Sequence, residues 1–288
     1  MDLIIYGFIN SIILMLFSIG FSLAYGVSRI PNFAHGALYV FCACLTWILL
    51  NKLGMNYYFA LVVAILATAV LGTLIYLLVL QRVRGMPFSE LMASFAIGIA
   101  ILGILRISGF RGPQYSLPKF IKKTIFIFGV PVDMQRILII LIGIALLILL
   151  YIFIHYTKIG LALRAIAQDE PAALMLGIDI DICGALSLGI GALLVAIAAV
   201  LIIPLGIINI ETGYEVLIFA LAVCIIGGLG SLIGTVVASF ILGYLQILTV
   251  EFLNPTYQLI VALSAIILIL LFKPSGFFGK QKELEERV

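Results

Sequence analysis

Residues 137–151 read ILIILIGIALLILLY, a run in which only the last residue, Tyr151, carries a polar side-chain atom. A strand of a membrane β-barrel would alternate polar and apolar residues over about ten positions, and this run shows no such alternation. Inside a bilayer the backbone must satisfy its own hydrogen bonds, and a helix does so within one segment. The run therefore predicts a transmembrane helix and an all-α fold.

Composition extends this prediction to the whole chain. Hydrophobic residues make up 65% of the 288 positions and charged residues only 10%, whereas soluble domains are about half apolar and a quarter charged. A water-soluble fold could not bury so much apolar surface, so we expect an integral membrane protein. The formal net charge of +3 is too small to indicate a nucleic-acid partner.

Apolar stretches bounded by polar residues, Gly or Pro recur along the sequence. They cover residues 3–27, 33–50, 56–80, 89–110, 137–155, 182–204, 215–228, 231–250 and 256–272. Because a crossing needs about 20 apolar residues, they predict a polytopic protein with about 8–9 transmembrane or re-entrant helices in a single domain, residues 1–288. Only Leu229 and Gly230 separate two of the stretches, which leaves open a short, broken or re-entrant helix there. The first stretch lacks a basic start and a cleavage site, so we expect it to be retained.

The positions of Lys and Arg indicate an orientation, because cytoplasmic loops tend to be basic. If the loop 156–181 is cytoplasmic, strict alternation puts nine basic residues inside: Arg29, Arg82, Arg84, Lys158, Arg164, Lys273, Lys280, Lys282 and Arg287. It puts six outside: Lys52, Arg111, Lys119, Lys122, Lys123 and Arg136. This bias predicts an N-outside, C-inside arrangement. The outer loop 111–136 is long and contains three prolines, and we expect it to form a folded cap against a partner.

The polar segment 158–181, KIGLALRAIAQDEPAALMLGIDID, lies between two spans and has an apolar surface of its own. Its apolar residues indicate that the segment packs against another protein surface, which a solvated linker would not do. It predicts a compact helical hairpin at the cytoplasmic face. A hairpin that lies on the membrane interface is the alternative.

Local signals within this segment place two short helices. The first is expected over 160–168. The second, 171–176, begins at a proline preceded by Asp169 and Glu170, a combination typical of a helix start. Gly177 provides a helix stop. Small alanines on both helices would allow close contact with a groove, so side-chain size should matter more than charge in this hairpin.

Two further motifs lie at the ends of apolar stretches. Asn32 is a candidate N-cap for the second span, which would place His35 in the first helical turn. A structural hydrogen-bonding role and a gating or pathway-lining role are both open for His35. The spacing Gly230-x-x-x-Gly234 permits close helix approach, and the glycines before it permit an interrupted helix. Tight packing and ligand contact are both open for this cluster.

Four stretches resemble one family of membrane proteins. Residues 160–177 fit the pattern G-x-x-x-R-A-x-x-x-D-x-x-A-A-x-x-x-G, and residues 29–36, RIPNFAHG, fit R-x-x-N-F-A-H-G. Residues 226–231, IGGLGS, with Gly234 resemble a GGLGS-x-x-G stretch, and residues 273–279, KPSGFFG, are similar to an R-P-x-G-L-F-G ending. These patterns are similar to those of the permeases of branched-chain amino acid ABC importers, over essentially the whole chain. Residues 81–85, QRVRG, depart from the family's usual Arg-Pro-Leu-Arg sequence.

The resemblance implies a permease subunit in a prokaryotic inner or plasma membrane. The residues that would couple it to an ATPase are Gly160, Arg164, Ala165, Ala167, Asp169, Glu170, Ala172, Ala173 and Gly177. The residues that would line or gate the pathway are Asn32, His35, Gly36, Gly227, Gly228 and Gly230. The implied partners are ATP-binding subunits, a second related permease chain, an extracytoplasmic substrate-binding protein, membrane lipid and a branched-chain or related amino acid. No cofactor is expected on this chain, because ATP and Mg would bind to the partner ATPase subunits.

The sequence also argues against catalysis by the chain itself. It contains no G-x-x-x-x-G-K-[S/T] phosphate loop and no H-E-x-x-H motif, and its four cysteines lack the paired spacing of a metal site. The rival interpretation is an ATP-independent carrier or channel for a small neutral solute. Such carriers usually couple transport to an ion or proton through carboxylates or an unwound helix near the membrane midplane, whereas the centres of these spans are nearly free of Asp and Glu. We therefore expect the energy to come from partner subunits.

Overall fold

The computed structural model describes residues 2–29, 31–110, 112 and 115–279. Its α-helices are α1 (Asp2–Ser28), α2 (His35–Asn51), α3 (Tyr57–Leu78), α4 (Pro87–Ile107), α5 (Met134–Tyr156), α6 (Lys158–Gln168), α7 (Glu170–Met175), α8 (Ile180–Ile202), α9 (Thr212–Gly227), α10 (Leu232–Phe252) and α11 (Gln258–Phe272). Short 3-10 helices are η1 (Leu80–Val83), η2 (Ile203–Leu205) and η3 (Pro255–Tyr257). Two strands, β1 (Thr124–Ile127) and β2 (Val130–Asp133), form a hairpin before α5.

The helices confirm the prediction of an all-α polytopic membrane protein. Seven described helical segments are long and apolar enough to cross a membrane, and α2 and α9 are shorter apolar helices. With these two, the described helices reach the number expected from the sequence. The break predicted between the stretches 215–228 and 231–250 is present, because Gly228 and Gly230 take φ values of +99° and +78°. The shorter element at this break is α9.

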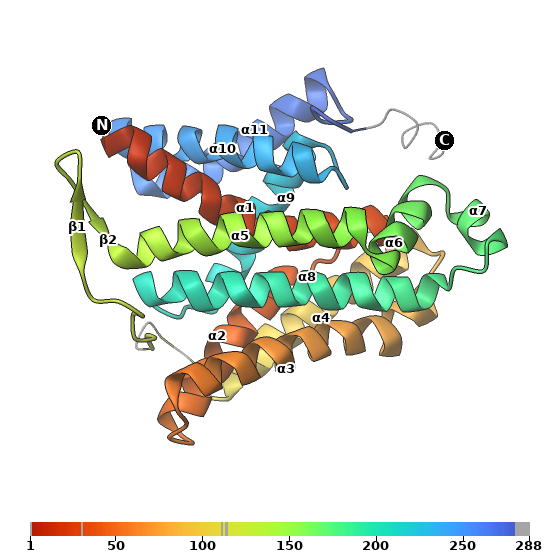
Figure 1. Ribbon diagram of the computed structural model, residues 1–288, viewed down its shortest axis with the longest axis horizontal. Helices are drawn as coiled ribbons and strands as arrows, with labels where there is room; N and C mark the ends of the chain where they lie inside the picture. Colours follow the sequence, from red (N-terminus) through yellow and green to blue (C-terminus); the bar gives the residue numbers. More distant parts are fainter. Residues whose placement is uncertain (1, 30, 111, 113–114, 280–288) are drawn as a thin grey trace.

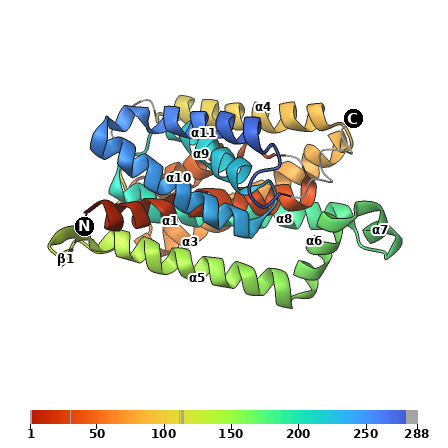
Figure 2. The ribbon, with the colours of Figure 1, turned by 90° about the horizontal axis from the view of Figure 1, so that it is seen from above.

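The helices form a bundle with α1 and α8 at its centre. In the most apolar window of α8, 72% of residues are buried, against 6% in α11. Figure 2 shows α4 and α11 on one side of the bundle and α5 on the other. Because lipid is as apolar as a leucine side chain, helices in a membrane associate mainly through close packing of small residues. A Cβ added to Gly20 of α1 would lie 2.6 Å from the carbonyl oxygen of Gly191 in α8, so these two backbones touch.

The two ends of the bundle carry different elements. The start of α1 and the β1–β2 hairpin lie at one end, and α6 and α7 lie at the other (Figure 1). The C-terminal residues 274–279 share the α6–α7 end, because they pack against the break between α9 and α10, which touches Gly26 near the end of α1. We call these the hairpin end and the α6–α7 end.

The β1–β2 hairpin is an element that the hydropathy pattern did not predict. Its turn residues, Phe128 and Gly129, both have positive φ values, +49° and +84°, as a two-residue type I′ turn requires. The inner face of the hairpin packs on the start of α1, where the Tyr6 hydroxyl donates to the carbonyl oxygen of Pro131 at 2.7 Å. The expectation of a folded segment within 111–136 is therefore confirmed. The β-branched and aromatic residues around Gly129 were the available signal.

The hairpin leads directly into α5. The Asp133 carboxylate accepts from the backbone N–H of Gln135 and so caps the first turn of the helix. Lys119 also donates to this carboxylate. The hydrogen bond from Lys119 holds the pKa of Asp133 below its ordinary value, so the cap stays ionised at neutral pH.

The prediction that Asn32 is the N-cap of the second span is wrong. The helix α2 starts at His35 with Ala34 at the N-cap position and no side-chain cap. The Asn32 side chain instead accepts from the backbone N–H of Ala34 at 3.1 Å, which closes a turn just before the helix. His35 lies in the first helical turn, as expected.

Candidate functional site

The segment between α5 and α8 folds into the predicted helical hairpin. Thr157 caps α6 by accepting from the N–H of Gly160 at 3.0 Å, and Asp169 caps α7 by accepting from the N–H of Ala172 at 3.0 Å. Gly177 follows α7 with φ of +78°, a value that favours glycine. Cap, proline and glycine signals thus place both helices within two residues of the predicted bounds.

One face of this hairpin packs on the membrane bundle. Leu163, Ile166 and Ala173 are buried in a cluster with Val27, which lies near the end of α1. At Gly160, an added Cβ would lie 2.3 Å from the carbonyl oxygen of Phe153, so α6 turns tightly against the end of α5. These contacts fix the hairpin to the membrane domain without a partner.

The other face of the hairpin is apolar and exposed. Leu174, Met175 and Leu176 are 56%, 90% and 79% exposed, and Leu161 on α6 is 60% exposed. The α6–α7 hairpin projects from the bundle in both ribbon views (Figures 1 and 2). An exposed patch of large apolar side chains beyond the ends of the spans is typical of a protein–protein contact.

The alanines that the sequence suggested for contact with a groove lie on both faces of the α6–α7 hairpin. Ala172 is exposed, whereas Ala173 is buried against the bundle. Ala165 and Ala167 are partly buried, and Ala165 packs on the buried cluster below the hairpin. The Arg164 guanidinium turns back to the end of α5, with one nitrogen 3.5 Å from the carbonyl oxygen of His155. Of the four alanines, Ala172 is therefore the one that faces outward.

An arginine outside the hairpin holds it in place. Arg84, which follows η1, donates from one guanidinium nitrogen to Glu170 of α7 at 2.5 Å and from the other to Asp181 of α8 at 2.8 Å. Its side chain is 29% exposed, so these pairs are partly shielded from water. This contact was not predicted from the sequence. The available signal was the basic turn QRVRG, residues 81–85, on the same predicted side of the membrane as the acidic residues of the hairpin.

The Arg84 contact changes the interpretation of Glu170. The sequence suggested that Glu170 marks the start of the second short helix, and that charge would matter less than side-chain size in this hairpin. In the structure Asp169 is the cap, and Glu170 forms an ion pair within the chain. A charge change at Glu170 is therefore expected to loosen the attachment of α7 to η1 and α8.

His35 and Gly36 lie deep in the bundle. His35 is 1% exposed, and its Nε2 lies 2.8 Å from the carbonyl oxygen of Phe17 in α1. This contact supports the structural hydrogen-bonding role over the gating role. At Gly36, an added Cβ would lie 1.8 Å from the carbonyl oxygen of Gly213 at the start of α9. Both residues of the motif thus serve the packing of α2 against its neighbours.

The glycines at 227–230 also serve packing. Cβ atoms added to Gly227 and Gly234 would each lie within 2.5 Å of the other residue's backbone, so α9 and α10 touch at this point. Gly228 receives the C-terminal segment, and the N–H groups of Phe277 and Phe278 donate to the carbonyl oxygens of Ile226 and Gly227 at 2.9 Å. The GGLGS and KPSGFFG motifs therefore contact each other. The second motif donates hydrogen bonds to carbonyl oxygens that would otherwise be unpaired at the end of α9.

Comparison with known proteins extends these findings to the whole chain. Residues 3–271 match the family model described as branched-chain amino acid transport system / permease component. The chain is 28% identical to the high-affinity branched-chain amino acid transport system permease protein BraD of Pseudomonas aeruginosa, over 92% of this chain and 91% of that protein. It is 29% identical to the LivH permease of Escherichia coli K12, with the same coverage. A probable LivH of Methanocaldococcus jannaschii is 27% identical, over 94% of this chain and 90% of that protein.

A solved structure supports the fold. PsaBC from Streptococcus pneumoniae in complex with Fab contains a chain that superposes with a TM-score of 0.52 at 14% sequence identity, covering 100% of this chain and 96% of that one. The helical bundle, its exposed hairpin and a family match over nearly all of the chain agree with one another. The chain belongs to the permease components of branched-chain amino acid transport systems.

Proposed function

We propose that this chain forms the translocation pathway of an ABC importer for branched-chain or related amino acids, and that α6 and α7 receive the force of ATP hydrolysis. Separate cytoplasmic subunits bind ATP and Mg, a second related permease chain completes the pathway, and an extracytoplasmic binding protein delivers the substrate. The α6–α7 end faces the cytoplasm in this arrangement. Membership of the transport family supports the substrate class.

The observation that carries the proposal is the two-faced α6–α7 hairpin. Its inner face is bound to α1, α5 and α8 by buried apolar contacts and by Arg84. On its outer face, the side chains of Leu174, Met175 and Leu176 are exposed beyond the ends of the spans. A partner that moved this face would move the ends of the attached helices, as a coupling element must.

Two neighbouring alanines allow a sharp test of this role. In complexes reconstituted with their ATPase and binding subunits, Ala172→Trp should abolish amino-acid uptake and substrate-stimulated ATP hydrolysis, because the bulky ring would occupy the exposed contact face. The thermal unfolding temperature of the isolated permease should not change, since the Ala172 side chain is exposed. Ala172→Ser, which keeps the size of the residue, should retain transport.

Ala173→Trp is the matched control for folding. Ala173 is 2% exposed, so the ring would overpack the cluster below the hairpin and destabilise the permease by about 1–3 kcal/mol. Normal uptake by Ala172→Trp would refute the coupling role of the hairpin. Uptake that persists when the ATPase subunits are omitted would favour the rival carrier.

A further inference from the structure

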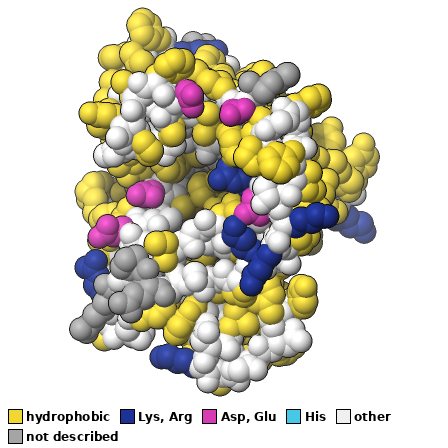
Figure 3. All heavy atoms as spheres, turned by 90° about the vertical axis from the view of Figure 1, so that its left-hand side faces the viewer, with side chains coloured by type: hydrophobic (Ala, Val, Ile, Leu, Met, Phe, Trp, Pro, Cys, Tyr) yellow, Lys and Arg dark blue, Asp and Glu magenta, His cyan; other side chains and the backbone are white. Residues whose placement is uncertain are grey.

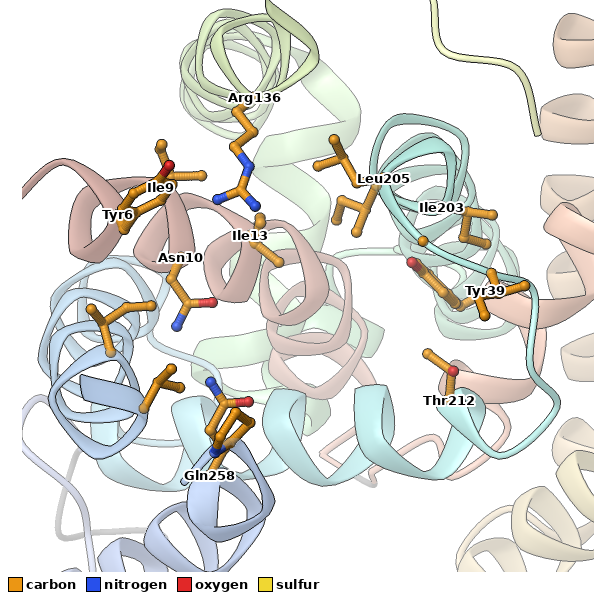
Figure 4. A pocket seen from close by; sticks show the side chains of 16 residues that line it. Tyr6, Ile9, Asn10, Ile13, Tyr39, Arg136, Ile203, Leu205, Thr212 and Gln258 are labelled. Carbon is orange, nitrogen blue, oxygen red and sulfur yellow. The ribbon is translucent and has the colours of Figure 1, made fainter. Parts of the chain in front are cut away.

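A cavity of ≈ 500 Å³ opens at the hairpin end of the bundle. Residues from α1, α2, α5, α8, α9, α10 and α11 line it, so it lies where many of the spans end (Figure 4). Figure 3 shows the same end face, with a hollow between apolar side chains and Lys and Arg side chains close by. The volume is in the range of sites that bind small molecules, about 300–1,000 Å³. None of the pathway residues expected from the sequence lines this cavity.

The walls of the cavity are mostly aliphatic. The side chains of Ile9, Ile13, Ile202, Ile203, Ile247 and Val250 contribute to them. Burying a branched aliphatic group against such walls is favourable, because it removes apolar surface from water. The cavity therefore suits a ligand with a compact aliphatic portion.

One cation reaches into this apolar space. The Arg136 guanidinium lies over the Tyr6 ring, 4.9 Å from its centroid, and points into the cavity in Figure 4. Among the described residues no carboxylate lies within ion-pair distance of Arg136. The Asp133 carboxylate pairs with Lys119 and interacts with the Arg136 charge only at longer range. An arginine fork in such a position is suited to bind a carboxylate through two parallel hydrogen bonds.

Neutral oxygen atoms lie opposite the cation. The Asn10 Nδ2 donates to Gln246 Oε1 at 2.9 Å and to the carbonyl oxygen of Gly243 at 3.2 Å. Because both partners are acceptors, the Asn10 Oδ1 must face the other way, toward the cavity, as Figure 4 shows. The Tyr39 and Gln258 side chains supply further polar atoms to the lining. These neutral oxygens can accept hydrogen bonds from an ammonium group, but they bind it more weakly than a carboxylate would.

We infer that this cavity is a transient site for a zwitterionic amino acid with an aliphatic side chain. Arg136 binds the α-carboxylate, the Asn10 oxygen accepts from the α-ammonium, and the isoleucine walls hold the side chain. The absence of Asp and Glu from the lining keeps the affinity low enough for release and disfavours cationic amino acids. This inference rests on the proposed function, since it names where that transporter would hold its substrate.

A single cysteine gives a direct measure of occupancy. Thr212 lines the cavity from the start of α9, and Thr212→Cys changes little volume. The four native cysteines are buried, so a small polar maleimide should label the new thiol preferentially. Thr124→Cys on the exposed face of β1, outside the cavity, is the matched control. In the reconstituted complex, L-leucine should slow labelling at Thr212→Cys and not at Thr124→Cys, and leucinamide, which lacks the carboxylate, should not slow it.

Arg136→Gln then tests the role of the guanidinium. The leucine concentration that gives half-maximal protection should rise about tenfold or more, as expected for the loss of a charge-assisted hydrogen bond. Lys122→Gln, which removes a positive charge from the nearby loop and not from the cavity, should leave protection unchanged. If the complex imports leucine but leucine never protects Thr212→Cys, or protects it equally after Arg136→Gln, the inference is wrong. Absence of leucine import by the unmodified complex would instead refute the proposed function.

Discussion

Single glycines set the distances between the helices of this bundle. The start of α2 meets the start of α9 where Gly36 faces Gly213, and an added Cβ would overlap a carbonyl oxygen there. Gly103, in the last part of α4, has no neighbouring atom within 4 Å of an added Cβ and has no positive φ. The same residue type therefore has a packing role at one site and none at the other.

Alanine substitution at these two glycines should have opposite effects on stability. Gly36→Ala should lower the thermal unfolding temperature, because α2 and α9 must separate to admit the methyl group, at a cost of about 1–3 kcal/mol. Gly103→Ala should be neutral or raise that temperature, because alanine favours a helix interior by about 0.5–1 kcal/mol over glycine. Thermal unfolding of both variants in the same detergent would measure this. Equal unfolding temperatures would show that the α2–α9 contact is looser than described.

At the scale of elements, Arg84 links the segment after η1 to α7 and α8, which lie far from it in sequence. It follows η1 and binds one acid of α7 and one acid of α8, and a second arginine, Arg29, donates to the carbonyl oxygen of Ala167 in α6. The α6–α7 hairpin is therefore attached to the bundle on two sides by charged groups and beneath by apolar contacts. A rigid attachment of this kind transmits a displacement instead of absorbing it.

Arg84→Gln should weaken the attachment of the α6–α7 hairpin to the bundle without unfolding the bundle. The change removes two partly exposed ion pairs and leaves Glu170 and Asp181 without their shared cation, which should cost about 1 kcal/mol and so speed local opening about fivefold. Amide hydrogen exchange should increase in residues 158–179 and stay unchanged in α8. Arg82→Gln, at an exposed neighbouring arginine, serves as the control. Equal exchange in both variants would mean that Arg84 does not secure the hairpin.

At the scale of the whole molecule, the two ends of the bundle differ in what they expose. The hairpin end carries the β1–β2 hairpin, a lysine-containing loop and the cavity, whereas the α6–α7 end carries the exposed apolar helices and the C-terminal segment. An importer needs this division, because substrate arrives on one side and ATP is hydrolysed on the other. The positive-inside tendency of the sequence predicts that the α6–α7 end faces the cytoplasm.

Replacing one lysine at each end of the bundle by cysteine allows this orientation to be measured. In intact cells, a maleimide that cannot cross the membrane should label Lys122→Cys, before β1, and should label Lys158→Cys, at the start of α6, only after permeabilisation. Both side chains are exposed, and the native cysteines are buried and should give little background. The opposite labelling pattern would reverse the orientation and remove the α6–α7 hairpin from the reach of a cytoplasmic ATPase.

The sequence by itself determined the class of fold, nearly all of the helices and the two helices of the α6–α7 hairpin. These features depend on local quantities, namely runs of hydropathy and the chemistry of Asp169, Pro171 and Gly177. A β-hairpin of two four-residue strands was missed because it is too short for a hydropathy signal. The N-cap of α2 was misplaced because Asn32 could close a turn or cap a helix, and both readings fit the same residues.

Only the tertiary structure decided which residues act together. Arg84 lies 86 and 97 positions from its two acids, and no local pattern specifies such a pairing. The same holds for the contact of Gly36 with Gly213 and for Gly228 with the C-terminal segment. The cavity beside Arg136 is formed by the ends of seven helices, so its shape depends on how they pack. Local hydropathy sets which segments are helices in the membrane, but the juxtaposition of their side chains follows from close packing of the whole bundle.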